Sequence, residues 1–433
     1  MSASDAGGGE PEFSDSEVRT IALAIIAGVL FGGVATGVAF PTLPLLNDIL
    51  GISAVMLGLI LSANRFTRMP MNAPAGNIID RMGARKPMIA GLFIQALAPF
   101  GYVIGMNVPS VQVATLPWVG AVSAPGAIFL VARMFWGVGS AFVFIGAFAT
   151  ISHVTNSGNR GRWLGYMRGG QSLGFPTGLV IGGFLTDIAS PTVAFLTAGV
   201  LALIAGLVAT IVLPDVHPES EEQARLRDIP RMLRRQPLIF PMGVGNMTIR
   251  FMFGGVLLAT VAQYANAYDM ELSIFSAAGI SGAVLAFGVI SSGTATVVSG
   301  RVSDVVSNRI VVTIPAFASL ATGLFILAQF PSIEFLFLAC GLMGLGTGGI
   351  GPALLALVGD MTPGNELGRM GGAFNFMGDI GNTAGPLLAV PLVEVTNFQI
   401  TYLACAGAVV LAALVVTIPL LHWNVSAGRS VGT

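Results

Sequence analysis

The sequence predicts an all-α integral membrane protein whose twelve transmembrane helices form two pseudo-symmetric bundles of six. Three observations predict this fold: a very apolar composition, twelve apolar runs of membrane-spanning length, and basic residues that alternate between the two sides of those runs. The chain of 433 residues is 54% hydrophobic and only 9% charged, and its mean hydropathy is +0.83. Soluble globular domains carry about 25% charged residues, so this composition excludes a soluble fold.

Twelve runs of largely apolar residues follow one another along the chain, each long enough to cross about 30 Å of hydrocarbon. We expect helices over residues 20–45, 53–76, 87–106, 124–153, 162–187, 191–213, 238–265, 273–300, 310–330, 334–361, 368–395 and 398–422. The predicted domains are a disordered cytoplasmic tail (1–19), a six-helix bundle (20–213), a polar cytoplasmic linker (214–237), a second six-helix bundle (238–422) and a cytoplasmic tail (423–433).

The basic residues predict the orientation of these helices. Fifteen of the twenty Lys and Arg residues fall in segments on one side of the predicted membrane, and the loops on the other side hold none. They are Arg19, Arg81, Arg85, Lys86, Arg160, Arg162, Arg225, Arg227, Arg231, Arg234, Arg235, Arg301, Arg309, Arg369 and Arg429. Because basic residues favour the cytoplasmic side, both termini and the linker are predicted to be cytoplasmic.

The two bundles are predicted to repeat one another. Placing Arg162 on Arg369 gives an offset of 207 residues, and the same offset superposes several glycines without a gap. The pairs are Gly137 with Gly344, Gly139 with Gly346, Gly174 with Gly381, and Gly178 with Gly385. Two similarly oriented six-helix halves are typical of transporters that move one half against the other around a central site.

A charged hairpin, Gly76 to Lys86, separates the second apolar run from the third. Its four charged residues cannot lie in hydrocarbon, so the hairpin is predicted to be in water. A weaker copy, Gly300 to Asp304, follows the eighth run. Two further motifs stand out: Arg133 followed by Gly137 and Gly139, and a Gly/Pro segment from Gly170 to Gly178.

In these three motifs the chain resembles the major facilitator superfamily, over nearly all its length. The hairpin is similar to that family's signature loop between helices 2 and 3, with Ala84 inserted between Gly83 and Arg85. The other two motifs resemble its helix 4 arginine motif and the helix 5 motif of its exporters, where Phe175 separates Gly174 from Pro176. The resemblance implies a gradient-driven solute transporter that works by alternating access.

The hairpin is the predicted cytoplasmic gate. Its expected members are Gly76, Asp80, Arg81, Gly83, Arg85 and, from the second half, Asp304. Asp80 is predicted to approach the N-terminus of helix 11 near Gly368, where a carboxylate is favoured by the helix dipole. The alternative is that these residues serve only as topological anchors, which the arginines do in either case.

Charged residues inside the predicted spans are the main candidates for mechanism. They are Arg65, Arg68, Arg133, Arg168, Arg250 and Asp379. Asp379 and Arg65 lie at nearly the same depth on helices that the resemblance places face to face. We therefore expect an ion pair between Asp379 and Arg65 or Arg68 that bridges the halves and breaks when Asp379 takes up a proton. The alternatives are a permanent, inert salt bridge for Asp379 and a headgroup contact for Arg68.

Polar residues at similar depth predict a solute cavity. Arg168 and Gln171 lie on helix 5, Asn246 and Arg250 on helix 7, and Asn375 on helix 11. Arg133 is predicted to take part in coupling or conformational change, and the alternative is that it ties helix 4 to backbone carbonyls of helix 1.

The predicted function is proton-coupled export of a small anionic or neutral amphipathic solute, by a monomeric transporter in the cell membrane, surrounded by lipid. Five buried arginines against one buried aspartate favour a non-cationic solute. The alternative is an uptake symporter for an organic anion. No catalytic or metal-ligating pattern, cofactor motif or nucleic-acid-binding pattern is visible, so an enzyme is not expected, and the short loops disfavour a receptor.

Overall fold

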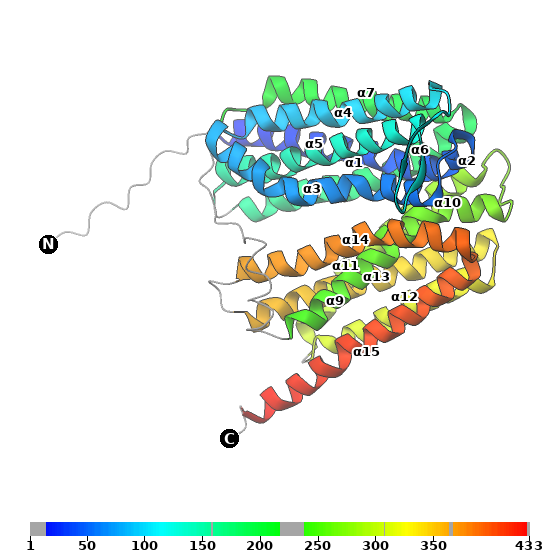
Figure 1. Ribbon diagram of the computed structural model, residues 1–433. Helices are drawn as coiled ribbons and strands as arrows, with labels where there is room; N and C mark the ends of the chain where they lie inside the picture. Colours follow the sequence, from blue (N-terminus) through cyan, green and yellow to red (C-terminus); the bar gives the residue numbers. More distant parts are fainter. Residues whose placement is uncertain (1–13, 157–158, 217–237, 307, 363–366, 431–433) are drawn as a thin grey trace.

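The computed structural model describes residues 14–156, 159–216, 238–306, 308–362 and 367–430. Its helices form two bundles that lie one above the other in Figure 1. The first bundle, the N-half, contains α1 (Asp15–Thr42), η1 (Leu43–Leu46), α2 (Asn47–Leu50), α3 (Ala54–Met82), α4 (Arg85–Asn107), α5 (Ala124–Val154), α6 (Arg160–Ile188) and α7 (Pro191–Val212). The second bundle, the C-half, contains α9 (Ile239–Ile249), η3 (Arg250–Leu257), α10 (Leu258–Ala267), α11 (Ala277–Val305), α12 (Ile310–Gln329), α13 (Ile333–Met361), α14 (Leu367–Val395) and α15 (Phe398–Ser430).

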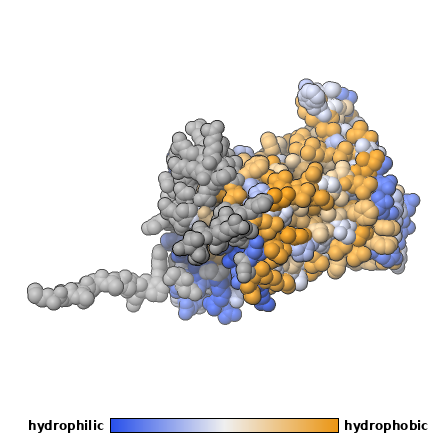
Figure 2. All heavy atoms as spheres, turned by 90° about the horizontal axis from the view of Figure 1, so that it is seen from below, coloured by the Kyte–Doolittle hydropathy of each residue, from blue (hydrophilic) through white to orange (hydrophobic). Residues whose placement is uncertain are grey.

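Each of the twelve predicted spans corresponds to one long helix or, for 238–265, to the continuous run of α9, η3 and α10. Nine of the described helical runs are long and apolar enough to cross a membrane on their own. The long helices outside that set are α3, α6 and α14, which carry most of the charges inside the spans. Figure 2 shows a broad apolar band between two hydrophilic ends, as a membrane protein requires.

Several predicted boundaries were wrong. Helix α1 begins at Asp15, inside the predicted tail, because Ser14 and Glu17 form a capping box that satisfies the first backbone N–H groups. Helix α15 continues to Ser430 and includes most of the predicted tail 423–433. Most of the predicted linker, residues 217–237, lies outside the described residues. The predicted loop between α4 and α5 contains an antiparallel hairpin of β1 (Gln112–Leu116) and β2 (Gly120–Ser123).

The glycines paired by the offset of 207 make equivalent contacts in the two halves. A Cβ added to Gly174 of α6 would collide with the carbonyl oxygen of Leu30 on α1, and one on Gly381 of α14 with that of Met247 on α9. Gly137 of α5 abuts α3 through the carbonyl of Asn64, and Gly344 of α13 abuts α11 through that of Gly288. The internal repeat is therefore present as the same helix pairs packed through the same positions.

The halves meet through α3 against α14 and α6 against α11. We call the end at which α1 begins and α15 finishes the inner end, and the opposite end the outer end. Among the described residues, every hydrogen bond between the halves lies towards the outer end. Ser62 of α3 donates to the carbonyl oxygen of Thr383 on α14 at 2.7 Å, and Asp187 of α6 accepts from the start of α11. The outer end is therefore closed by polar contacts.

Candidate functional site

Four of the predicted polar residues form one cluster inside the C-half. Arg250 donates from Nη1 to Oδ1 of Asp379 at 2.9 Å, from Nη2 to Oδ1 of Asn375 at 2.8 Å, and from Nε to Oδ1 of Asn246 at 3.3 Å. Three acceptors therefore hold the guanidinium in one orientation. We call Asn246, Arg250, Asn375 and Asp379 the polar cluster.

Local features of two helices position the polar cluster. Asn246 and Arg250 are four residues apart on one helical run, as are Asn375 and Asp379 on α14, so each pair lies on one helix face. Arg250 begins the π-helical segment η3, a distortion found mainly at functional sites. A Cβ on Gly378 would lie 2.5 Å from Nδ2 of Asn246, so a glycine at this position lets α14 approach closely enough for the contacts to form.

The cluster is anchored on one side and accessible on the other. Asn246 is buried and donates from Nδ2 to the carbonyl oxygen of Phe374 at 2.7 Å. The side chains of Arg250 and Asp379 remain 32% and 23% exposed. These two charged side chains therefore form the accessible side of the cluster.

The predicted ion pair between Asp379 and Arg65 or Arg68 is absent. Arg65 and Asp379 do lie at the same depth, because Ser62 lies opposite Thr383 and the same antiparallel register puts Arg65 level with Asp379. Asp379 nevertheless pairs with Arg250, because α14 packs on α9 and η3 within its own half through Gly381 and Gly385. Asp379 therefore makes its ion pair within one half and not between the halves.

Arg65 and Arg68 still contribute charge beside the cluster. Arg65 interacts electrostatically with Asp379 and Arg250, and Arg68 with Arg250. The buried Nη1 of Arg65 has no hydrogen-bond partner within the described part of the chain. The interface next to the cluster therefore carries two further positive charges from the N-half.

Arg133 lies deep in the N-half against an aromatic ring. Its side chain is 1% exposed, its Nε donates to the carbonyl oxygen of Ile60 at 3.3 Å, and its guanidinium carbon lies 5.2 Å from the centroid of the Phe40 ring. Arg65 approaches the same ring at 5.9 Å. Arg133 is therefore hydrogen-bonded to a backbone carbonyl of α3, and not to one of α1 as the alternative predicted. Arg133 and Arg65 contact α1 through cation–π interactions with Phe40.

Arg168 and Gln171 do not join the polar cluster. Both are exposed on the inner half of α6, and within the described residues neither makes a hydrogen bond. Farther along α6, Leu179 is buried and its carbonyl oxygen abuts Gly282 of α11. The two residues therefore lie nearer the inner end than this close approach of α6 to the C-half.

Among the described residues, the contacts of the predicted inner gate lie within each half. Asp80 and Arg81 are exposed, Gly76 is buried on α3, Gly83 ends α3 with φ +79°, and Arg85 donates to the carbonyl oxygen of Thr210 at 3.0 Å. Asp304 and Asp360 share Arg309 at 3.0 and 2.8 Å. The residues before α14, at 363–366, lie outside the described part, so the approach of Asp80 to helix 11 stays a prediction.

One residue that joins the two halves at the outer end, Asp187, was not among the predicted site residues. Asp187, near the end of α6, accepts hydrogen bonds from the backbone N–H groups of Ser276 and Gly279, both at 2.8 Å, and from the hydroxyl of Ser276 at 2.5 Å. A carboxylate of the N-half thus caps α11 of the C-half, where the helix dipole favours negative charge. Asp187 and Ser276 are 89 residues apart in the sequence, so no local pattern connects them.

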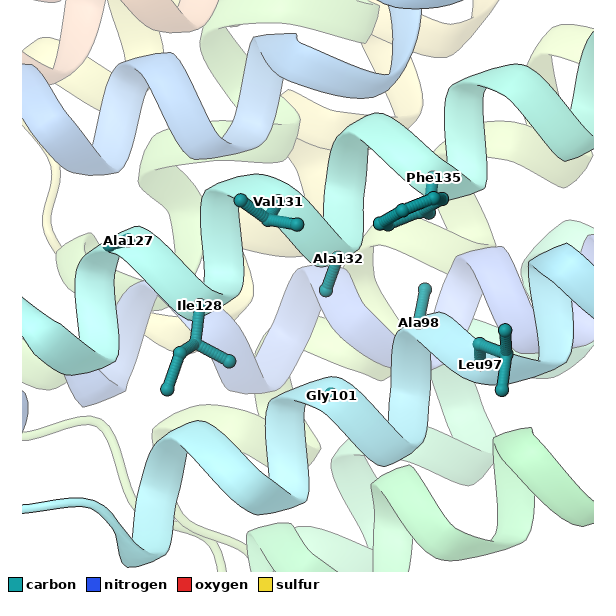
Figure 3. Close-up of a pocket in the computed structure, with 8 residues that line it drawn as sticks. All are labelled: Leu97, Ala98, Gly101, Ala127, Ile128, Val131, Ala132 and Phe135. Carbon is teal, nitrogen blue, oxygen red and sulfur yellow. The ribbon is translucent and has the colours of Figure 1, made fainter.

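Cavities of the described structure lie apart from the cluster, and two of them are characterised by their lining. One, of about 320 Å³, lies between α4 and α5 and is lined by apolar side chains that include Leu97, Ile128 and Phe135 (Figure 3). The other, of about 300 Å³, lies between the halves at the outer end and includes Asn47, Gln263 and Glu394. Neither includes a residue of the polar cluster. No group of metal-ligating side chains is found among the described residues.

Comparison with known proteins agrees with this architecture. The chain is 24% identical over 427 residues to "Multidrug resistance protein 2" of Bacillus subtilis (strain 168), which covers 93% of this chain and 96% of that protein. It is 28% identical to "Multidrug resistance protein 1" of the same organism, in a match that covers 48% of this chain and about half, 49%, of that protein.

Solved structures share the fold. A bacterial homolog of the human lysosomal transporter Spinster, solved in an inward-facing and occupied conformation, matches with a TM-score of 0.70 and 13% identity, over 96% of this chain and 98% of that one. The nucleoside transporter NupG matches with a TM-score of 0.73 and 14% identity, over 91% and 98%. The family model of the Major Facilitator Superfamily matches residues 25–294 and 278–422. The chain therefore belongs to the Major Facilitator Superfamily and is a multi-pass membrane transporter of that type.

Proposed function

We propose that this transporter is a monomeric, proton-coupled exporter of small amphipathic organic solutes, resident in the cell membrane with both termini in the cytoplasm. The polar cluster carries this proposal, because it places an ionisable carboxylate, 23% exposed, directly on an arginine that also interacts electrostatically with Arg68 of the N-half. The multidrug resistance proteins of Bacillus subtilis support export as the direction. The position of the basic residues supports the orientation.

Protonation of Asp379 changes the charge of the site. While Asp379 is ionised, its pair with Arg250 is formally neutral and the interface can hold a solute without net charge. When Asp379 takes up a proton, Arg250 keeps its charge beside Arg65 and Arg68 and must be hydrated. A neutral amphipathic solute is then disfavoured, so proton and solute exclude one another. Mutual exclusion at one site is what exchange of proton for solute requires.

The same geometry favours a second candidate for an anionic solute. Once Asp379 is protonated, the guanidinium of Arg250 is free to bind a carboxylate or phosphate, which pairs well with its fork of N–H donors. Proton and anion would then bind together and cross in the same direction. The charge of the solute therefore decides between exchange and symport.

Transport by purified protein in vesicles, driven by a pH jump, tests the proposal. Neutral and anionic amphipathic compounds are compared for the wild type and for Asp379→Asn, which keeps the shape of the side chain and removes its charge change. We expect Asp379→Asn to abolish proton-driven transport while solute-for-solute exchange continues. Unchanged pH dependence in the variant would show that Asp379 is not the coupling residue. Proton-driven accumulation of an anion inside the vesicles, from the acidic side, would establish symport.

A further inference from the structure

The β-hairpin between α4 and α5 is attached to the bundle at its base, through Ser110, and at its turn, through Val119. The hydroxyl of Ser110 donates to the carbonyl oxygen of Leu50 at 2.8 Å, and that of Ser53 to the carbonyl oxygen of Val119 at 3.3 Å. Both contacts are made with the corner between α2 and α3. Val122 of β2 is buried in the core of the bundle and Val119 packs against that core, whereas every residue of β1 is exposed.

The hairpin exposes several apolar side chains and carries no charge. Val111, Val113 and Leu116 are 59%, 57% and 46% exposed, and Trp118 at the turn is 96% exposed. The segment from Met106 to Ala124 contains no charged residue. Exposed apolar side chains with no charged residue among them favour an apolar or amphipathic environment over water.

The backbone at the turn indicates that the tryptophan itself is needed. Trp118 has φ +70°, a left-handed conformation that favours glycine or asparagine, and it follows Pro117. A bulky aromatic residue is strained there. Strained residues of this kind are found where the side chain has a function, which here is the presentation of an indole at the tip.

The direction of the hairpin indicates which part of its surroundings it contacts. In Figure 1 the two strands lie in front of the bundle, beside the outer parts of the helices and not beyond their ends. Figure 2, which is turned by 90° from Figure 1 and seen from below, shows the same segment as a protrusion from the upper edge of the molecule, near its outer end. The hairpin therefore extends sideways, along the plane that a membrane around the apolar band would occupy.

We infer that this hairpin is a membrane-surface anchor that lies in the interfacial layer of the bilayer leaflet at the outer ends of the helices. Its partner is phospholipid: the indole of Trp118, apolar in its body with a polar N–H, occupies the boundary between headgroups and acyl chains. Since the segment carries no charge, the contact depends on this boundary and not on the charge of the headgroups.

Fluorescence of the full-length protein in lipid vesicles tests the anchor. The contribution of Trp118 is obtained as the difference between the wild type and Trp118→Phe, because the chain holds only three other tryptophans. We expect this contribution to be blue-shifted relative to tryptophan in water, quenched by lipids brominated near the top of the acyl chain, and shielded from aqueous iodide. The same result is expected in zwitterionic vesicles and in vesicles that contain anionic lipid.

A second measurement keeps the test independent of the substitution at Trp118. A nitroxide attached at Ala121→Cys, on the exposed part of β2, should be more accessible to oxygen than to a water-soluble nickel complex. Emission typical of water, with iodide quenching and no effect of bromine, would overturn the anchor. A Trp118 emission that neither brominated lipid nor iodide quenches, and that changes with the density of protein in the membrane, would also overturn it. That result would indicate contact with a second copy of the chain.

Discussion

Removing the carboxylate of Asp187 should shift the protein towards states that are open at the outer end. Asp187 makes three hydrogen bonds to the start of α11, two of them from backbone N–H groups at 2.8 Å. Hydrogen bonds to a charged group each contribute about 1.5–3 kcal/mol and an N-cap about 0.5–2 kcal/mol. Because the carboxylate is half-buried, we take about 2 kcal/mol for Asp187→Ala, or about a thirtyfold change in the equilibrium.

Distances between spin labels at the outer ends of the two halves measure this change. Cysteines introduced at Val193 on α7 and Pro331 before α13 provide the label sites, and the native Cys340 and Cys405 are buried. We expect the long-distance population to grow in Asp187→Ala and to grow less in Asp187→Asn, which keeps an acceptor oxygen. The control is Glu271→Ala, which removes an exposed carboxylate from the same end of the molecule. Equal distance distributions in all four proteins would refute the role of Asp187 as a closure.

Three further substitutions separate packing from mechanism. Gly381→Ala places a Cβ against the carbonyl oxygen of Met247 and should destabilise the protein by about 1–3 kcal/mol, seen as a lower melting temperature. The control is Gly371→Ala on the same helix, whose added Cβ meets no atom within 4 Å and should leave the melting temperature unchanged. Arg250→Lys cannot reach three acceptors at once and should weaken solute binding about tenfold or more, measured beside Arg168→Lys; equal effects of the two would count against the polar cluster. Arg133→Met removes a buried charge that has no carboxylate beside it in the described structure. The melting temperature should therefore be nearly unchanged while the transport rate falls. Loss of folding in this variant would contradict a role of Arg133 in coupling.

The helices and their repeat could be predicted from the sequence because both depend on order along the chain. Membrane thickness sets the length of an apolar run, and a glycine that faces another backbone tolerates no side chain. Gly174 and Gly381 therefore mark equivalent close approaches at a constant offset. Pairs four residues apart, Asn246 with Arg250 and Asn375 with Asp379, were visible for the same reason.

The partner of Asp379 could not be predicted in this way. Depth along a helix follows from residue number, but several arginines share that depth. The choice depends on which helix face turns towards which neighbour. Gly381 and Gly385 face α9 and η3, and this turns Asp379 towards Arg250. The same glycines could have indicated this direction, because their repeat partners Gly174 and Gly178 follow one face of α6.

The hairpin and Asp187 were missed for different reasons. Val111 and Val113, at alternate positions, are followed by a turn with Pro117 and Gly120. This is a recognisable hairpin pattern, but the only elements predicted were the membrane helices. Asp187 lies at a helix end, where an acid is common and its partner, the start of α11, is distant in sequence. Only the packing of the two halves brings them together.

The position of the ion pair between Asp379 and Arg250 also bears on how the protein is made. Because both residues belong to the C-half, the charge on α14 finds its counter-charge on a helix that is synthesised earlier, within the same bundle. A half that neutralises its own buried charge does not need the other half in order to become stable in the bilayer. The C-half expressed alone should therefore insert into the bilayer with this ion pair formed.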